Sequence, residues 1–216
     1  WKGKLLEDLY RATLRTLAMP TLFALLALLV LRPPAAHAQS IDDGLVRYWT
    51  FDEGSGPTAA DASGSGNTAI LHTPGSFTAN GAPTDFANPA AFAGSGPDTY
   101  ARAPGRNIDP LNTITIAFWM HINPDTPPDF MDLVTLGNGK AHFDYVSNQL
   151  GFQMTFGPAG VTLFALKNWA DGRWHHVAGT FDGATMRLYI DGELQNSYSP
   201  LIPQLPVGQD VLVGAD

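Results

Sequence analysis

The stretch Arg173 to Leu194, RWHHVAGTFDGATMRLYIDGEL, decides the fold of this 216-residue chain. Short runs of apolar, aromatic and β-branched residues occupy Trp174 to Phe181 and Met186 to Ile190. An Asp-Gly dipeptide follows each run, at 182–183 and at 191–192. Such dipeptides mark tight turns, because glycine accepts a positive φ without strain. The segment therefore predicts two paired antiparallel strands and the start of a third.

The residues before this stretch continue the same pattern. After Ser40 no segment has helical periodicity, and short β-type runs alternate with Gly, Pro, Asn and Asp. The clearest run is Ile114 to Ile122, where apolar side chains at every second position predict one face in a dry core. The other predicted strands are 45–51, 68–71, 90–92, 100–103, 132–136, 142–146, 150–156, 161–166 and 211–213. We therefore expect an all-β fold.

Residues 1–38 have the features of a signal peptide with residues upstream of it. Basic residues precede an uncharged apolar run from Thr21 to Leu31, and Ala36 and Ala38 are small where a signal peptidase reads. As a helix this run would rise about 16 Å, which is too short for a bilayer core of about 30 Å. We expect cleavage after Ala38, no stable membrane span, and a secreted or cell-surface product. The initiator is either Met19 or a methionine upstream of Trp1.

The net charge and the cysteine content exclude several classes of partner and of site. The leader carries five basic and two acidic residues while the whole chain has net charge −8, so the remainder has net charge −11. An acidic surface repels nucleic acid and anionic lipid, so we expect neither as a partner. Cysteine is absent, so no disulfide framework and no thiolate metal site can form.

Five segments carry a pattern beyond their strand character. They are Tyr48–Gly56 (YWTFDEGSG) with the following DASG and Asn67, Ala90–Ala103, Thr115–Ile122 (TIAFWMHI), the opening stretch, and Val211–Ala215 (VLVGA). The fourth is the most specific, because WHHVAGTFDG is followed by LYIDG. In this order, they resemble the laminin-G-like (LamG-like) jelly roll of the concanavalin A-like lectin/glucanase superfamily.

The resemblance implies a two-sheet antiparallel jelly-roll sandwich over residues 44–216, preceded by the helical signal peptide. Family members usually continue past the fifth segment into a strand of the type GxIDEVRIY, which pairs near the first strand. The sequence ends at Asp216. We therefore expect the last strand of the family pattern to be missing and the domain to be truncated at its C-terminal end.

The resemblance also implies a structural calcium ion near the first loop. Calcium binds six to eight oxygens from carboxylates, amides and backbone carbonyls. Asp52, Asp61 and Asn67, with carbonyls of the glycine-rich loop 54–66, offer such oxygens. In the family an aspartate of the last strand completes the site, and that position lies beyond Asp216. The alternative is a solvated acidic loop without metal.

The acidic residues argue against hydrolysis. Glycosidases need two carboxylates placed across the sugar bond, and the family's retaining glucanases carry them on an ExDxE-type strand. After the leader the glutamates are Glu53 and Glu193, each beside a turn glycine, and Asp144 has no second acid on its strand. We therefore expect no enzymatic activity.

Neither histidine pair predicts a strong metal site. His175 and His176 are adjacent on a strand and must face opposite sides, so they cannot bind one ion from the same face. We expect one to point toward the core and one away, in a structural role. His142 and Asp144 share a face, but two ligands without a third are a weak site.

Aromatic residues are the candidates for ligand contact, because binding surfaces of this fold combine aromatic rings with short polar groups. We select Trp119, Tyr145 and Trp169 as ligand-binding candidates. Trp119 lies opposite the apolar face of its strand. For each tryptophan the alternative is core packing, and Trp49 and Trp174 match family positions that look like core.

The sequence favours a non-catalytic binding module of a larger secreted or cell-surface protein. The resemblance makes carbohydrate its expected ligand, so the expected partners are a glycan or an extracellular protein. The alternative is a protein–protein adhesion or structural LamG module. A glycoside hydrolase of the glucanase branch is less expected. A row of exposed aromatics on one concave face would favour carbohydrate.

Overall fold

The computed structural model describes the chain in nine stretches that begin at Gly44. They are residues 44–72, 76–78, 91–93, 99–105, 113–125, 129–137, 141–156, 159–200 and 210–214. The expected signal peptide and its cleavage site lie outside the described residues. Within these stretches, no helix has the length and apolar character needed to cross a bilayer.

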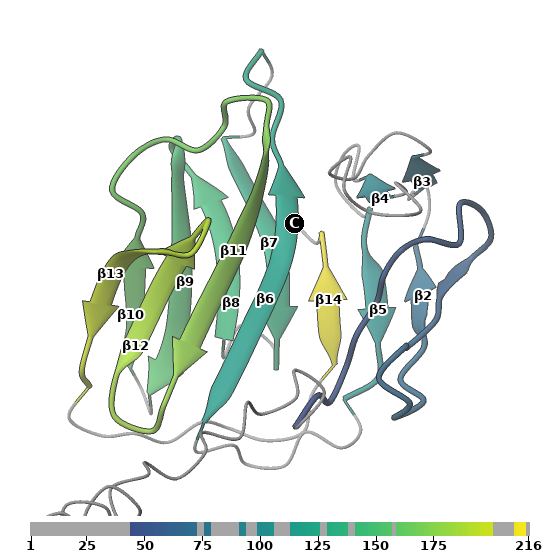
Figure 1. Ribbon diagram of the computed structural model, residues 1–216, viewed down its shortest axis with the longest axis horizontal. Helices are drawn as coiled ribbons and strands as arrows, with labels where there is room; N and C mark the ends of the chain where they lie inside the picture. Colours follow the sequence, from purple (N-terminus) through teal and green to yellow (C-terminus); the bar gives the residue numbers. More distant parts are fainter. Residues whose placement is uncertain are drawn as a thin grey trace, which may run out of the picture. The chain divides into compact units, whose positions relative to one another are not determined.

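The stretch that decides the fold lies in a four-stranded sheet. β11 (Trp174–Phe181) and β12 (Met186–Ile190) form a hairpin, and β13 (Glu193–Tyr198) continues it. β6 (Ile114–His121) pairs with the other side of β11, which gives the antiparallel order β13-β12-β11-β6. Figure 1 shows these strands side by side. The predicted meander is confirmed.

A larger sheet has eight strands in the order β1-β2-β5-β14-β7-β8-β9-β10, and every pair is antiparallel. Its strands are β1 (Thr58–Ala59), β2 (Ala69–Leu71), β5 (Ala101–Ala103), β7 (Phe130–Leu136), β8 (Ala141–Val146), β9 (Gln149–Phe156), β10 (Ala159–Phe164) and β14 (Val211–Val213). A separate pair consists of β3 (Ser76–Thr78) and β4 (Ala91–Ala93). The expected two-sheet antiparallel sandwich is confirmed, with this small pair beside it.

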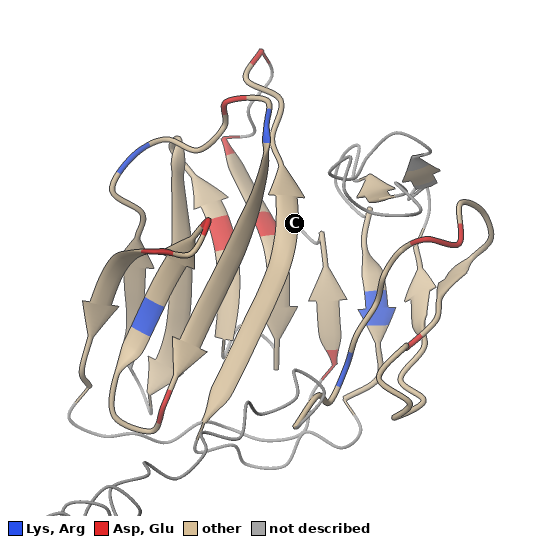
Figure 2. Cartoon of the chain, in the orientation of Figure 1, with Lys and Arg blue, Asp and Glu red and all other residues tan. Residues whose placement is uncertain are grey.

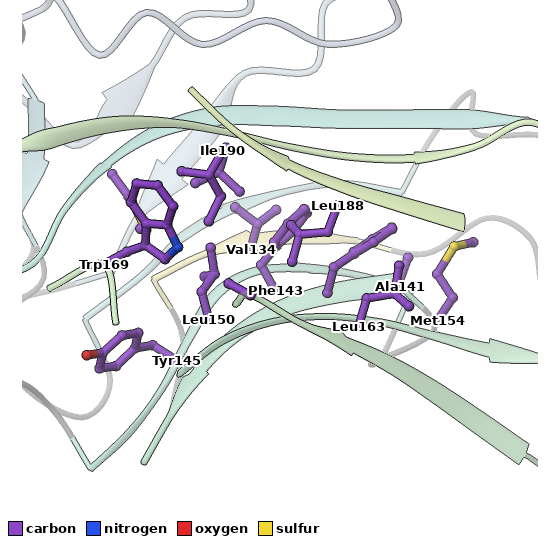
Figure 3. Packing of buried hydrophobic residues seen from close by; sticks show 14 of the residues in the cluster. Val134, Ala141, Phe143, Tyr145, Leu150, Met154, Leu163, Trp169, Leu188 and Ile190 are labelled. Carbon is purple, nitrogen blue, oxygen red and sulfur yellow. The ribbon is translucent and has the colours of Figure 1, made fainter. Parts of the chain in front are cut away.

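The main core lies between the four-stranded sheet and strands β7 to β10 of the larger sheet (Figure 3). The rings of Phe143 and Phe152 stack with centroids 4.7 Å apart, and Phe118 meets Phe143 edge-on at 5.0 Å. Gly179 of β11 faces them without a side chain, and a Cβ there would lie 2.5 Å from Phe143. The two sheets therefore approach closely because position 179 is glycine.

The turns of the meander follow from their Asp-Gly dipeptides. Asp191 and Gly192 both have positive φ, 52° and 80°, as a two-residue type I′ hairpin turn requires. At the other turn, Asp182 Oδ1 accepts hydrogen bonds from the backbone N–H groups of Ala184 and Thr185. The sequence therefore specifies both reversals locally.

The predicted first strand, residues 45–51, is wrong. Trp49 forms only an isolated antiparallel bridge with Asp61, and Phe51 has a φ of 56°, which takes the backbone out of the extended region. Instead, Trp49 packs against the core and donates its Nε1–H to the carbonyl oxygen of Asn67 at 3.0 Å. Trp49 and Phe51 therefore pack against core residues without forming a strand.

Gly179→Ala should destabilise the domain by about 1–3 kcal/mol, because its methyl group would overlap the Phe143 and Phe152 rings. Gly160→Ala is the matched control on an exposed strand position, where the nearest atoms belong to the flexible Gln153 side chain. Denaturant unfolding measures both. A Gly179→Ala protein as stable as the wild type would contradict this packing.

Candidate functional site

The outward side of the four-stranded sheet carries an aromatic surface. Because β6 and β11 alternate strictly, their apolar residues enter the core and the intervening residues point outward. We call this surface the aromatic face. It consists of Ala117, Trp119, His121, Trp174, His176, Ala178 and Tyr189.

Two aromatic pairs form one end of the aromatic face. Trp119 is paired in register with His176, and their ring centroids are 5.3 Å apart in an edge-on arrangement. His121 is paired with Trp174 at 5.5 Å, and its Nε2 lies 3.1 Å from the carbonyl oxygen of Gly172. Trp119 is 44% exposed. Each of the two strands thus contributes one tryptophan and one histidine to this end of the face, and each tryptophan lies opposite a histidine.

A floor of small side chains lies next to these pairs. Ala117 pairs with Ala178, which in turn pairs with Tyr189 on β12. Neighbouring side chains on one face of a sheet are separated by one strand spacing or two residues, so Trp119 and Tyr189 rise beside the two alanines. A flat apolar group can therefore lie on the alanines and contact both aromatic rings.

A buried, hydrogen-bonded histidine lies on the core side of β11, beneath the aromatic face. His175 is 5% exposed; its Nδ1 lies 2.8 Å from Asp191 Oδ2 and its Nε2 lies 2.9 Å from Asp171 Oδ1. The hydrogen bond with His175, opposed by partial burial and assisted by Arg173, lowers the pKa of Asp171 well below its usual range. Asp191 Oδ1 also accepts the backbone N–H of His176. The expected division of the two histidines, one inward and one outward, is confirmed.

An ion pair lies on the same outward side, toward the other end of β11 from Trp174. Arg187, on the outward side of β12, donates from Nη1 to Asp182 Oδ2 at 2.5 Å. This hydrogen bond, with those from the turn N–H groups, lowers the pKa of Asp182 to about 2. Figure 2 shows the strands of the sheet largely tan, with a blue segment on β12.

Of the predicted ligand-binding residues, only Trp119 lies on a surface. Tyr145 is fully buried and Trp169 is 5% exposed, and both are core members (Figure 3). The Tyr145 hydroxyl donates to Asn168 Oδ1 at 2.8 Å. These two assignments are corrected, because both side chains are buried in the core. Trp174, expected in the core, instead points outward with His176.

The structure brings two of the three predicted calcium ligands together. Asp61 Oδ1 accepts the backbone N–H groups of Tyr48 and Ser63, and its Oδ2 accepts that of Asn67 at 2.9 Å. Burial raises the pKa of Asp61, but these hydrogen bonds prevail and lower it to about 2. Asp52 is exposed on the turn before them. The Asp61 carboxylate therefore holds the loop in place by accepting hydrogen bonds from backbone N–H groups.

Among the described residues, Glu53 and Glu193 lie on separate segments, whereas Asp144 lies opposite another acid. Glu53 accepts the N–H of Ala60 from an exposed turn, and Glu193 is exposed at the start of β13. Asp144 is 8% exposed and pairs in register with Asp132 of β7, and burial raises its pKa. Within the described stretches, no three His, Cys, Asp or Glu residues converge as a metal site.

Sequence reasoning missed the environment of Asp144. Its Oδ1 is buried without a hydrogen-bond partner and lies over Gly151, where a Cβ would be 2.2 Å away. His142 Nε2 is 4.0 Å from the other oxygen. The pairing of Asp144 with Asp132 depends on strand register, which no local pattern gives.

A shallow hollow of about 150 Å³ lies on the larger sheet. Tyr100, Arg102, Asp210 and Leu212 line it. The Arg102 guanidinium is bound to Asp210, which also accepts the backbone N–H of Gly105. The two charged groups of this hollow are therefore already bound to each other.

The sequence of the chain shows its family. Residues 94–216 match the profile of the Concanavalin A-like lectin/glucanases superfamily, Laminin_G_3. Because this match covers more than half of the sequence, the chain belongs to that superfamily. Comparison with curated proteins finds no sequence match.

Solved structures share the fold at low sequence identity. The binding domain of Paraclostridial Mosquitocidal Protein 1 superposes with a TM-score of 0.65 at 16% identity, over 82% of this chain and 46% of that one. The botulinum neurotoxin serotype D ligand binding domain, in complex with N-acetylneuraminic acid, gives 0.62 at 14%, over 81% and 44%. A structure of botulinum neurotoxin type C, whose cell entry depends on two ganglioside molecules, gives 0.59 at 15%, over 81% and 43%. The chain spans less than half the length of these proteins.

Asp61→Asn should lower stability at neutral pH by up to about 2 kcal/mol, since the native pKa of about 2 lies below an unfolded value of about 3.9. The contribution of the carboxylate is complete above about pH 4 and disappears as the pH falls through the native pKa. Denaturant unfolding from pH 7 to pH 2 should show the two proteins converging in acid. A constant difference across that range would contradict this role of Asp61.

Proposed function

We propose that this domain is a non-catalytic carbohydrate-binding module that receives a glycan on the aromatic face. The observation that carries the proposal is the exposed Trp119 beside the floor of Ala117 and Ala178. Sugar rings present apolar C–H faces that pack on indole and phenol rings, while their edges keep hydroxyls for polar groups. His176 and the Tyr189 hydroxyl offer such groups at the border of the floor.

Other observations support a binding role. The superfamily includes lectins; one structural neighbour is a complex with N-acetylneuraminic acid, and another is a toxin whose cell entry depends on two ganglioside molecules. In the described part of the chain Glu53 and Glu193 lie on separate segments, and the neighbouring Asp171 and Asp191 are hydrogen-bonded to His175, which does not favour hydrolysis. The leader sequence supports a secreted or cell-surface location, within a larger protein.

A protein ligand is the second candidate, and one observation favours it. Leu194 pairs with Tyr189 at the β13 edge and is exposed. An apolar side chain next to aromatic residues suits a protein contact as well as a sugar. Under this alternative the aromatic face would bind an extracellular protein and no glycan.

Trp119→Ala should weaken glycan binding by about tenfold or more, since a central aromatic contact is lost. Its stability should hardly change, because the indole stands on the solvent side of β6. A glycan array run with the full chain identifies the ligand, and titration calorimetry measures its affinity.

Phe130→Ala is the control variant, because Phe130 is an equally exposed aromatic residue on the other sheet. It should bind glycan like the wild type. Silence on every glycan, or equal losses for the two variants, would overturn the aromatic face as a sugar site.

We also propose that the loop containing Asp52, Asp61 and Asn67 binds a structural calcium ion. The exposed Asp52 and the carbonyls of the glycine-rich segment are the available oxygens, while Asp61 is occupied by backbone N–H groups. An ion that binds only the folded state raises the melting midpoint. Calcium should therefore raise the midpoint of the wild type more than that of Asp52→Asn. No shift at millimolar calcium would rule the ion out.

A further inference from the structure

We infer that the aromatic face selects uncharged glycans and rejects those ending in a sialic acid. This inference rests on the proposed function and deepens it by naming the class of sugar. Around the face, Arg173 and Arg187 are each bound to an aspartate carboxylate.

Arg187 is the cation on the outward side of the sheet, in register with Thr180 and Ser197. Its guanidinium is bound to Asp182 at 2.5 Å. The turn holds that carboxylate in place, because Asp182 Oδ1 accepts two backbone N–H groups. A ligand carboxylate would have to displace Asp182 from a preorganised ion pair.

Arg173, just before β11, is bound in the same way. Its Nε and Nη2 donate to Asp171 Oδ2 at 2.9 and 2.7 Å, and Asp171 also bonds to His175. Both ends of the sheet therefore carry an arginine whose charge is balanced by an aspartate on the adjoining turn or loop. Neither arginine is presented alone to an anionic sugar.

The other cations in the described part of the chain contact different kinds of groups. Arg47 donates to the carbonyl oxygen of Pro104, and Arg102 is bound to Asp210. The Lys167 ammonium lies 3.9 Å from the centroid of the Trp169 ring. None of these three residues belongs to the aromatic face.

The net charge of the chain and the apolar floor of the face also disfavour an anionic sugar. Beyond the leader the chain has net charge −11, so an anionic ligand is repelled as it approaches. On the face itself, its carboxylate would leave water for alanine and aromatic side chains without a partner charge, which costs free energy. An uncharged hexose or N-acetylhexosamine makes the ring contacts without that cost.

The experiment compares a neutral oligosaccharide ending in galactose with its sialylated derivative, on the full chain by titration calorimetry. The wild type should bind the neutral sugar about tenfold or more tightly than the sialylated one in low salt. The difference should shrink in high salt, because screening weakens the repulsion.

Asp182→Asn supplies a gain-of-function test. Asparagine keeps an Oδ1 acceptor for the turn N–H groups but releases Arg187, so the affinity for the sialylated sugar should rise several-fold while that for the neutral sugar stays unchanged. Asp129→Asn, which removes an exposed acid at the start of the other sheet's β7, is the matched control and should change neither.

The outcomes separate the two claims. Equal or tighter binding of the sialylated sugar by the wild type would overturn the charge selection and leave the glycan site in place. An equal gain in Asp129→Asn would also overturn it, because net charge rather than Arg187 would then be responsible. Binding of neither sugar, nor of any other glycan, would overturn the site itself.

Discussion

The register between β6 and β11 is the constraint on which the rest of the structure depends. Eight residue pairs, from Trp174 with His121 to Phe181 with Ile114, align two strands that both alternate between apolar and outward residues. A shift by one residue would exchange the two faces of a strand, so Trp119 would enter the core and Phe118 would meet water. The pairing of β6 with β11 therefore determines both which residues enter the core and which form the aromatic face.

The two ends of β11 are held by different means. At its C-terminal half Gly179 lets the sheets meet over Phe143 and Phe152, so the constraint there is steric. At its N-terminal end His175 lies between Asp171 and Asp191, and Asp191 also holds the backbone of His176. Since a buried polar ring is costly without partners, this hydrogen-bonded cluster keeps the end of the strand in one arrangement. The rings above it are thereby positioned before any ligand arrives.

Local patterns predicted the meander, its turns and the outward position of Trp119, because strand alternation and Asp-Gly turns depend only on residues that are close in the sequence. The same alternation could have shown Tyr145 to be buried, since it shares a strand face with Phe143. Trp169 could not be placed in this way, because it lies on a segment without periodicity. Trp174 follows His176 outward although its family position suggested core. The contacts of Trp119 with His176 and of Asp144 with Asp132 require register, which arises only when distant strands pair.

The indole N–H signals of the tryptophans test the central claim most directly. In a ¹⁵N-labelled protein, a soluble paramagnetic probe should broaden the signals of Trp119 and Trp174 and spare those of Trp49 and Trp169. A bound neutral glycan should shift the first pair and protect it from the probe. Broadening of Trp169, or a glycan that shifts neither Trp119 nor Trp174, would contradict the assignment of core and binding face to the two sides of this sheet.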